Sequence, residues 1–209
     1  MKHIHALALP FILVGALAAC VPVVPESTAT ASATPSPTAT IASPTPTPTP
    51  TVEPLSIPDC LTLLPLAVAR DNFSASTELL GEPAASDFQG REDVATIRVV
   101  LSNASSSRVC YWGVPNSDGL FFVTVAFINP GQRAALESDL AAAGYAQTTT
   151  GTVTAYELDG MNEVSSLGFT HLFTGDAWIH VDGSSIAFSG VIAAQVLDAM
   201  RAANPTLGL

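Results

Sequence analysis

Basic side chains are almost absent from this sequence of 209 residues. Its only lysine is Lys2, and 7 Lys and Arg stand against 18 Asp and Glu, for a net charge of −11. Binding to nucleic acid requires clustered Lys and Arg that neutralise phosphates, and electrostatic docking on anionic lipid has the same requirement. The composition therefore excludes nucleic acid as a partner, and it excludes a lipid surface that is held by charge alone.

Familiar catalytic motifs are also missing. The sequence has no Gly-rich phosphate loop, no Gly-x-Ser-x-Gly nucleophile elbow and no His-Glu-x-x-His zinc motif. The one pair of adjacent acids that precedes the predicted sheet, Glu92-Asp93, is most simply a solvated acidic loop. We therefore expect no catalytic residue and no cofactor.

The N-terminus has the pattern of an exported lipoprotein. A weakly basic start precedes an apolar run over residues 6–19, which is shorter than the ~20 residues that a membrane-spanning helix needs. The run ends in the sequence LAAC, whose cysteine is Cys20, and this resembles the bacterial lipobox. The resemblance implies a signal peptide over residues 1–19 and attachment to membrane lipid through acylated Cys20, on the extracytoplasmic face of the cell membrane. An ordinary secretory signal and an uncleaved anchor are the alternatives.

The cysteine count supports export independently. The sequence has three cysteines, and an odd number in an exported protein needs an explanation. If Cys20 carries lipid, Cys60 and Cys110 remain as one pair in an oxidising compartment. A disulfide between them would close a loop of about 50 residues and stabilise the fold by roughly 3–5 kcal/mol in the chain-entropy model. Two buried free thiols are the alternative.

Residues 20–57 predict a disordered spacer that begins at the lipidated cysteine. Of the 16 prolines in the sequence, 10 lie between residues 22 and 58, mostly among Thr, Ser and Ala. Such a composition removes backbone donors and offers too little apolar area to offset chain entropy. In a fully extended polyproline conformation the spacer would reach on the order of 110 Å.

The remaining residues, 58–209, predict a single extracytoplasmic domain of the α+β class. Their order, α-β-β-β-α-β-β-β-α, predicts a twisted antiparallel sheet with helices packed on one face. The expected elements are a helix over 59–68 that Pro65 splits, a loop over 74–93 with a helical turn at Leu79-Leu80, strands over 95–101, 108–114 and 120–128, a helix from Asn129 to Gly144, a strand over 148–158 interrupted near Gly151, a hairpin of 163–173 with 177–181, and a helix that ends before Asn204.

Two short motifs carry a family resemblance. Asp59-Cys60 is followed by LTLL, and Cys110 begins the sequence CYW. A helix start with this cysteine, bridged to a Cys-x-Trp strand, is similar to the DUF3558-like envelope lipoproteins of actinobacteria, whose function is unknown. The resemblance implies a β-sheet and a C-terminal helix after these motifs, and it supplies no catalytic residues.

The last predicted hairpin contains the candidate site residues. A connection of two or four residues would place His171 opposite His180 and Phe173 opposite Trp178, all on one face, whereas a three-residue loop would break this register. The two imidazoles are the candidates for Zn²⁺ or Cu²⁺ if a third ligand such as Asp182 lies nearby, although we assign no metal. Phe173 and Trp178 could instead form an exposed binding face, or an aromatic patch with histidine at its margin. Since the C-terminal helix must cover an apolar surface, we expect it to bury both aromatic residues and make this face core.

Two functions from different classes follow. The favoured one is a membrane-tethered, non-catalytic domain that binds an envelope protein or a small ligand. The alternative is a secreted, wall-associated hydrolase that uses acidic residues. The hydrolase would need two carboxylates ~5–10 Å apart in a cleft.

Overall fold

The computed structural model describes residues 55–88, 90–92 and 94–209. The expected signal peptide, Cys20 and the spacer up to residue 54 lie outside these residues. In chain order the elements are α1 (Cys60–Leu63), α2 (Leu66–Asn72), β1 (Glu78–Gly81), the 3-10 helix η1 (Ala85–Asp87), α3 (Ala95–Asn103), β2 (Ser106–Gly113), β3 (Leu120–Phe127), α4 (Pro130–Ala142), β4 (Ala146–Thr150), β5 (Val153–Met161), β6 (Ser166–Thr174), β7 (Ala177–Gly183) and α5 (Ile186–Ala203).

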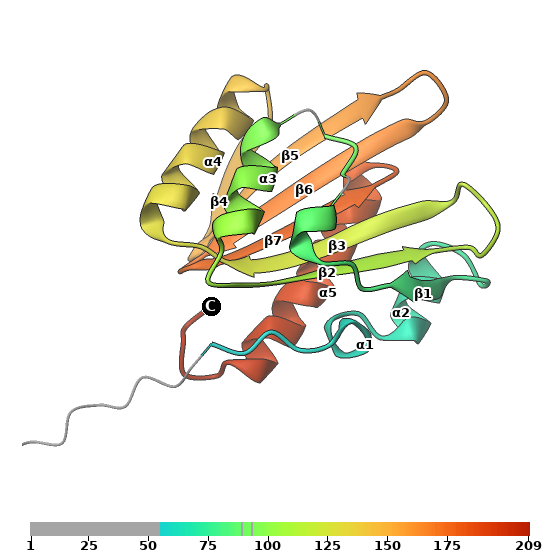
Figure 1. Ribbon diagram of the computed structural model, residues 1–209, viewed down its shortest axis with the longest axis horizontal. Coiled ribbons are helices and arrows are strands. Elements are labelled where there is room, and N and C mark those ends of the chain that lie inside the picture. Colours follow the sequence, from blue (N-terminus) through green and yellow to red (C-terminus); the bar gives the residue numbers. More distant parts are fainter. Residues whose placement is uncertain (1–54, 89, 93) are drawn as a thin grey trace, which may run out of the picture. The chain divides into compact units, whose positions relative to one another are not determined.

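The strands form one sheet in the order β1-β2-β3-β7-β6-β5-β4 (Figure 1). Every neighbouring pair is antiparallel. The α+β class and the antiparallel sheet are therefore confirmed. Strands β3 and β7 lie at the centre, and every residue of β7 is buried, which requires cover on both faces of the sheet.

Helices lie on both faces of the sheet, which corrects the expectation of one covered face. Helices α1, α2 and α5 complete one buried cluster, and α3 and α4 complete the other on the opposite face (Figure 1). The reason is visible in β6 and β7, whose alternate residues are apolar on each side. Leu172 and Ile179 face the first cluster, whereas Phe173 and Trp178 face the second.

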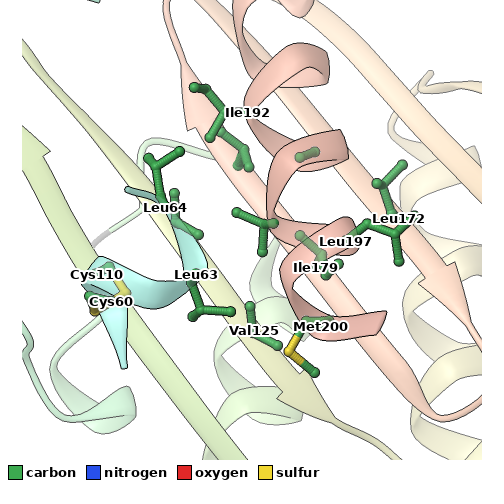
Figure 2. Packing of buried hydrophobic residues seen from close by; sticks show 14 of the residues in the cluster. Cys60, Leu63, Leu64, Cys110, Val125, Leu172, Ile179, Ile192, Leu197 and Met200 are labelled. Carbon is green, nitrogen blue, oxygen red and sulfur yellow. A yellow bond between two sulfur atoms is a disulfide. The ribbon is translucent and has the colours of Figure 1, made fainter. Parts of the chain in front are cut away.

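The first cluster is built around the C-terminal helix. Ile192, Val196 and Met200 lie on one stripe of α5 and are fully buried against the sheet. Figure 2 shows Met200 beside Val125 and the α1 residue Leu63 nearby. Among the described residues, α5 is the one helix long and apolar enough to cross a membrane. Its buried stripe identifies it as a core helix of this domain instead.

A disulfide joins Cys60 at the start of α1 to Cys110 in β2 (Figure 2). The two Cα atoms lie 5.8 Å apart, within the usual range for a bridge, and both residues are completely buried. This confirms the expected pairing and excludes two free thiols at these positions. The bridge fastens the helical start of the domain to the sheet.

The predicted strand over residues 95–101 is wrong, because this segment forms helix α3. Its β-branched residues favour a strand by local propensity. The buried residues are Ile97, Val100 and Leu101, however, and this i, i+3, i+4 spacing is that of a helix face. Packing on the sheet therefore overrides local preference.

Two other expected elements differ. Leu79 and Leu80 belong to strand β1, not to a helical turn, and β1 pairs with β2 at one edge of the sheet. The expected strand over 148–158 is two strands, β4 and β5, joined at Gly151, whose φ is +60°. A positive φ is accessible to glycine without a steric penalty, so this residue turns the chain instead of interrupting a strand.

The expected starts and ends of the other helices are confirmed. Pro65 separates α1 from α2. Asn129 and Gln132 form a reciprocal capping box at the start of α4. Gly144 follows the end of α4 with a φ of +91°.

The beginning of the described chain is held by its end. Ser56 donates its backbone N–H to Oδ1 of Asn204 at 2.8 Å, and Nδ2 of Asn204 donates to the Ser56 carbonyl at 2.8 Å. Asn204 follows α5 and is 5% exposed. The domain therefore already includes Ser56, two residues before the expected boundary.

Candidate functional site: a buried histidine–carboxylate cluster

The hairpin of β6 and β7 brings the two candidate histidines together. His171 pairs with His180 and Phe173 with Trp178, across a turn whose two central residues are Gly175 and Asp176. The register expected from an even-length loop is confirmed. The imidazole rings of His171 and His180 are stacked, with centroids 4.4 Å apart and an interplanar angle of 13°.

Phe173 and Trp178 do not form an exposed binding face. Both side chains are completely buried, in the cluster that α3 and α4 complete. Burial was expected, but beneath the C-terminal helix, and α5 covers the opposite face of these strands. The aromatic pair is thus part of the core, and a ligand or partner would have to contact another surface.

The acidic partner of the histidines is Glu92, from the loop that precedes α3. Its Oε1 lies 2.7 Å from Nε2 of His171, and its Oε2 lies 2.5 Å from Nε2 of His180. The hydroxyl of Tyr145 donates a hydrogen bond to Oε1. The side chain of Glu92 is 1% exposed, so the expectation of a solvated acidic loop is wrong for this residue. The next residue, Asp93, lies outside the described residues.

Asp182, the expected third ligand of a metal, binds Arg91 instead. Its Oδ1 accepts a hydrogen bond from Nε of Arg91 at 2.8 Å, and its Oδ2 accepts one from the Arg91 backbone N–H at 2.9 Å. Arg91 also donates to the carbonyl of Gly183 at 3.0 Å. Consecutive loop residues, Arg91 and Glu92, therefore engage Asp182 and His180, which lie two residues apart on one face of β7.

Trp178 determines which nitrogen of His171 carries the proton. Its indole N–H donates to Nδ1 of His171 at 3.1 Å, so Nδ1 must be unprotonated. A neutral His171 then carries its proton on Nε2, where it donates to Oε1 of Glu92. His171 is held from both sides, as an acceptor for Trp178 and a donor to Glu92.

Burial and mutual charge shift the pKa values of the cluster in different directions. Burial alone would raise the pKa of Glu92, but the imidazoles of His180 and His171 outweigh it and hold this pKa well below its usual range. Burial would lower the pKa of His180, yet the Glu92 carboxylate outweighs it and the pKa is raised. For His171, burial dominates and the pKa is lowered. These directions favour one charged pair, Glu92 with His180, beside a neutral His171.

Tyr145 remains protonated in this arrangement. Burial, and next the charge of Glu92, raise the pKa of its hydroxyl above the ordinary value. The protonated hydroxyl is therefore a permanent donor to Oε1 of Glu92.

The donor set of Glu92, His171 and His180 has the composition of a transition-metal site. The three candidate ligand atoms lie within 4.8 Å of one another. Ligating histidines, however, almost always donate their second ring N–H to an acceptor. Here Nδ1 of His171 faces a donor, Trp178, so a metal on Nε2 would require a fully deprotonated ring or the loss of this bond. The hydrogen bonds of this cluster fit a proton on Nε2 of His171 better than a metal ion at that atom.

Several atoms of the cluster have no hydrogen bond. Nε2 and Nδ1 of His180 and Oε2 of Glu92 are buried without a hydrogen-bond partner, although Nε2 and Oε2 are in contact. The pair is therefore held mainly by charge, without the alignment of a hydrogen bond. Unsatisfied buried groups of this kind are costly.

One cavity lies beside this cluster, and a second, larger depression lies away from it. A cavity of about 180 Å³ is lined by Glu92, Val94, Ala95 and Arg98. A larger depression of about 520 Å³ lies over α3 and α4, where apolar residues such as Val99 and Ala135 alternate with amide side chains. Neither lining contains two carboxylates.

Comparison with known proteins adds no family. The chain matches no family model, no curated protein and no solved structure. The resemblance to envelope lipoproteins therefore remains a prediction.

Arg91, Glu92 and Tyr145 are site residues that the sequence did not reveal, and Glu92 is the one that contacts both histidines. Its partners lie 79 and 88 positions further along the chain, so no local spacing connects them. The available signal was the length of the connection before α3, because long connections in compact domains are often functional.

Proposed function

We propose that this chain is a membrane-tethered extracytoplasmic lipoprotein whose folded domain is a non-catalytic binding module. The observation that carries the proposal is the buried bridge between Cys60 and Cys110. Structural disulfides form and persist in oxidising compartments outside the cytosol. The bridge uses two of the three cysteines, and the one that remains, Cys20, is the cysteine of the lipobox-like sequence.

The position of the domain in the chain supports a tether. The described domain begins at residue 55, and 34 residues separate Leu55 from Cys20. A Pro- and Thr-rich segment of this length can extend on the order of 100 Å at ~3.1 Å per residue. A lipid on Cys20 would thus leave the domain free to meet partners well above the membrane.

The state of the buried acids supports binding over catalysis. Glu92 and Asp182 are the acids that flank His180, and each is already engaged by a cationic side chain inside the domain. Their side chains are at most 1% exposed, so a glycan substrate has no access to them. The hydrolase alternative requires two accessible carboxylates in one cleft. We infer that a ligand or an envelope protein binds at the outer surface of the domain.

Lipid labelling and topology test the tether. In a bacterium that processes lipoproteins, the full chain should incorporate radioactive palmitate, sediment with membranes and be removed from intact cells by external protease. The Cys20→Ala variant should lose the label and the shorter mature form. A Cys60→Ala variant serves as the matched control, because it removes a cysteine without touching the lipobox-like sequence. Equal labelling of the wild type and Cys20→Ala would overturn the proposal.

A further inference from the structure

Arg91 and Glu92 together form a latch on the sheet. Arg91 is bound to Asp182 and to the carbonyl of Gly183, and Glu92 is bound to His171 and His180. All of these partners belong to β6 and β7. The latch thus fastens the loop before α3 to β6 and β7 by charge, and its Glu92 end is buried.

The one ring nitrogen of His171 that can take another proton already accepts a hydrogen bond. Nε2 already carries a proton and donates it to Glu92, so a second proton must bind to Nδ1. The indole N–H of Trp178 points at Nδ1 from 3.1 Å. Protonation would leave two donors facing each other, and the Trp178 bond would be lost.

The charges that face His171 are balanced before it takes up that proton. Glu92 and Arg91 approach from the loop, Tyr145 lies at the entry to β4, and His180 and Asp182 project from β7. Two negative groups, Glu92 and Asp182, match two positive ones, Arg91 and charged His180. A second charged imidazole would lie 4.4 Å from the first and leave one positive charge in excess inside the core.

We propose that His171 is an acid-sensitive switch, in which protonation of Nδ1 breaks the Trp178 bond and releases the latch of Arg91 and Glu92 from β6 and β7. The switch is closed at neutral pH. In the closed state Phe88, which precedes Arg91 in the same connection, contacts Phe122 and His180. Opening removes these contacts. With the extracytoplasmic location proposed above, the switch would respond to the pH outside the cytoplasm.

The direction of the response follows from linkage. Burial lowers the pKa of His171 in the closed state, whereas an opened, solvated His171 has its ordinary value of about 6.5. The open state therefore binds a proton more readily than the closed one. As pH falls below about 6.5, the ratio of closed to open molecules decreases by up to about tenfold per pH unit, until the closed state is protonated as well.

Nuclear magnetic resonance on residues 20–209, expressed without the signal segment and with Cys20→Ala so that no lipid is attached, tests the switch. Between pH 7.5 and 4.5, the ¹⁵N shift of His171 Nδ1 should report a new proton, and the indole proton of Trp178 should move upfield in the same step. The protection factor of the Arg91 backbone amide, which is its exchange rate relative to the intrinsic rate at the same pH, should fall at least tenfold once its bond to Asp182 is lost. Amides of the central strand β3 should keep their protection. His171 that stays neutral until β3 also loses protection would overturn the proposal.

Three variants identify the group that responds. His171→Asn keeps an acceptor for Trp178 and cannot be protonated, so the acid step should disappear. Trp178→Phe removes the opposing donor, so the step should move to higher pH. His180→Gln keeps an N–H near Glu92 and removes the neighbouring charge, so the step should persist and also move to higher pH. Loss of the step in His180→Gln would assign it to the other histidine and reject His171 as the switch. If His171→Asn does not fold, the wild-type titration and Trp178→Phe still decide.

Discussion

Oε2 of Glu92 and Nε2 of His180 lie 2.5 Å apart, and both side chains are at most 1% exposed. A charge pair in such surroundings has lost its hydration, and each partner depends on the other for compensation. Its position decides its effect, because it joins the loop before α3 to the central strand β7. The pair therefore controls where this loop lies on the sheet.

Removal of one partner from this pair should be costly. We expect Glu92→Gln to lower the free energy of unfolding by about 3–5 kcal/mol, because it leaves charged His180 without a counter-ion. Urea denaturation at pH 7 measures the change.

Glu137→Gln is the matched control for that experiment. It breaks the pair of Arg133 and Glu137 on α4, in which both side chains are about one-quarter exposed. An i, i+4 pair of this kind contributes about 0.3–0.5 kcal/mol. Similar effects of the two substitutions would contradict the assignment of a tightly coupled buried pair.

Stability should depend on pH in opposite ways on the two sides of neutrality. The pKa of His180 is raised on folding, so its contribution is complete below about 6.5 and is lost as pH rises through the raised value. The pKa of Glu92 is lowered, so its contribution is complete above about 4.5 and is lost as pH falls towards the lowered value. His171 weakens the fold below about 6.5, because the unfolded chain binds its proton more readily.

Urea midpoints measured from pH 4 to pH 9 check these signs. The wild type should be most stable near neutrality or slightly below it. In His180→Gln, the loss of stability at alkaline pH that this residue causes should vanish, whereas the loss of stability at acid pH should remain. An unchanged alkaline limb in His180→Gln would show that another group causes it.

The disulfide should be inaccessible and stabilising. Cys60 and Cys110 should resist alkylation in the folded protein until a reductant is added, and mass spectrometry of alkylated peptides detects this. Reduction should remove roughly 3–5 kcal/mol in the chain-entropy model and lower Tm by several degrees. The double variant Cys60→Ser, Cys110→Ser should have a Tm that reductant does not change, and a fall in its Tm would show that the reductant acts elsewhere.

The histidine pair should hold no stoichiometric transition metal. After equilibration with Zn²⁺ or Cu²⁺ at pH 7 and desalting, we expect well below one ion per chain, because Trp178 occupies Nδ1 of His171 as a donor. Elemental analysis measures the ratio. One ion per chain that His171→Ala and His180→Ala both remove would refute this prediction.

Features determined by neighbours in sequence could be predicted from the sequence. The even turn at Gly175-Asp176 set the register that places His171 opposite His180, and the capping box at Asn129 marked the start of α4. The odd cysteine count led to the bridge between Cys60 and Cys110. Each of these inferences needed only spacing along the chain or a count.

Features determined by distant contacts could not be predicted. Residues 95–101 carry strand-like side chains and form α3 because the sheet offers an apolar surface at helical spacing. Glu92 reads as a surface acid until His171 and His180 are known to lie beside it. The cover on both faces of the sheet, and the burial of Phe173 and Trp178 under α3 and α4, also depend on contacts between residues far apart in the sequence.

The two links at the start of the domain have a mechanical consequence. Tension applied along the chain before residue 55 first loads the hydrogen bonds of Ser56 with Asn204, and then the covalent bridge at Cys60. The bridge passes the force directly to Cys110 in β2, so the covalent path of the load bypasses the branch formed by residues 61–109. Arg91 and Glu92 lie in that branch. Tension on the chain before residue 55 is therefore not transmitted through the backbone of Arg91 and Glu92.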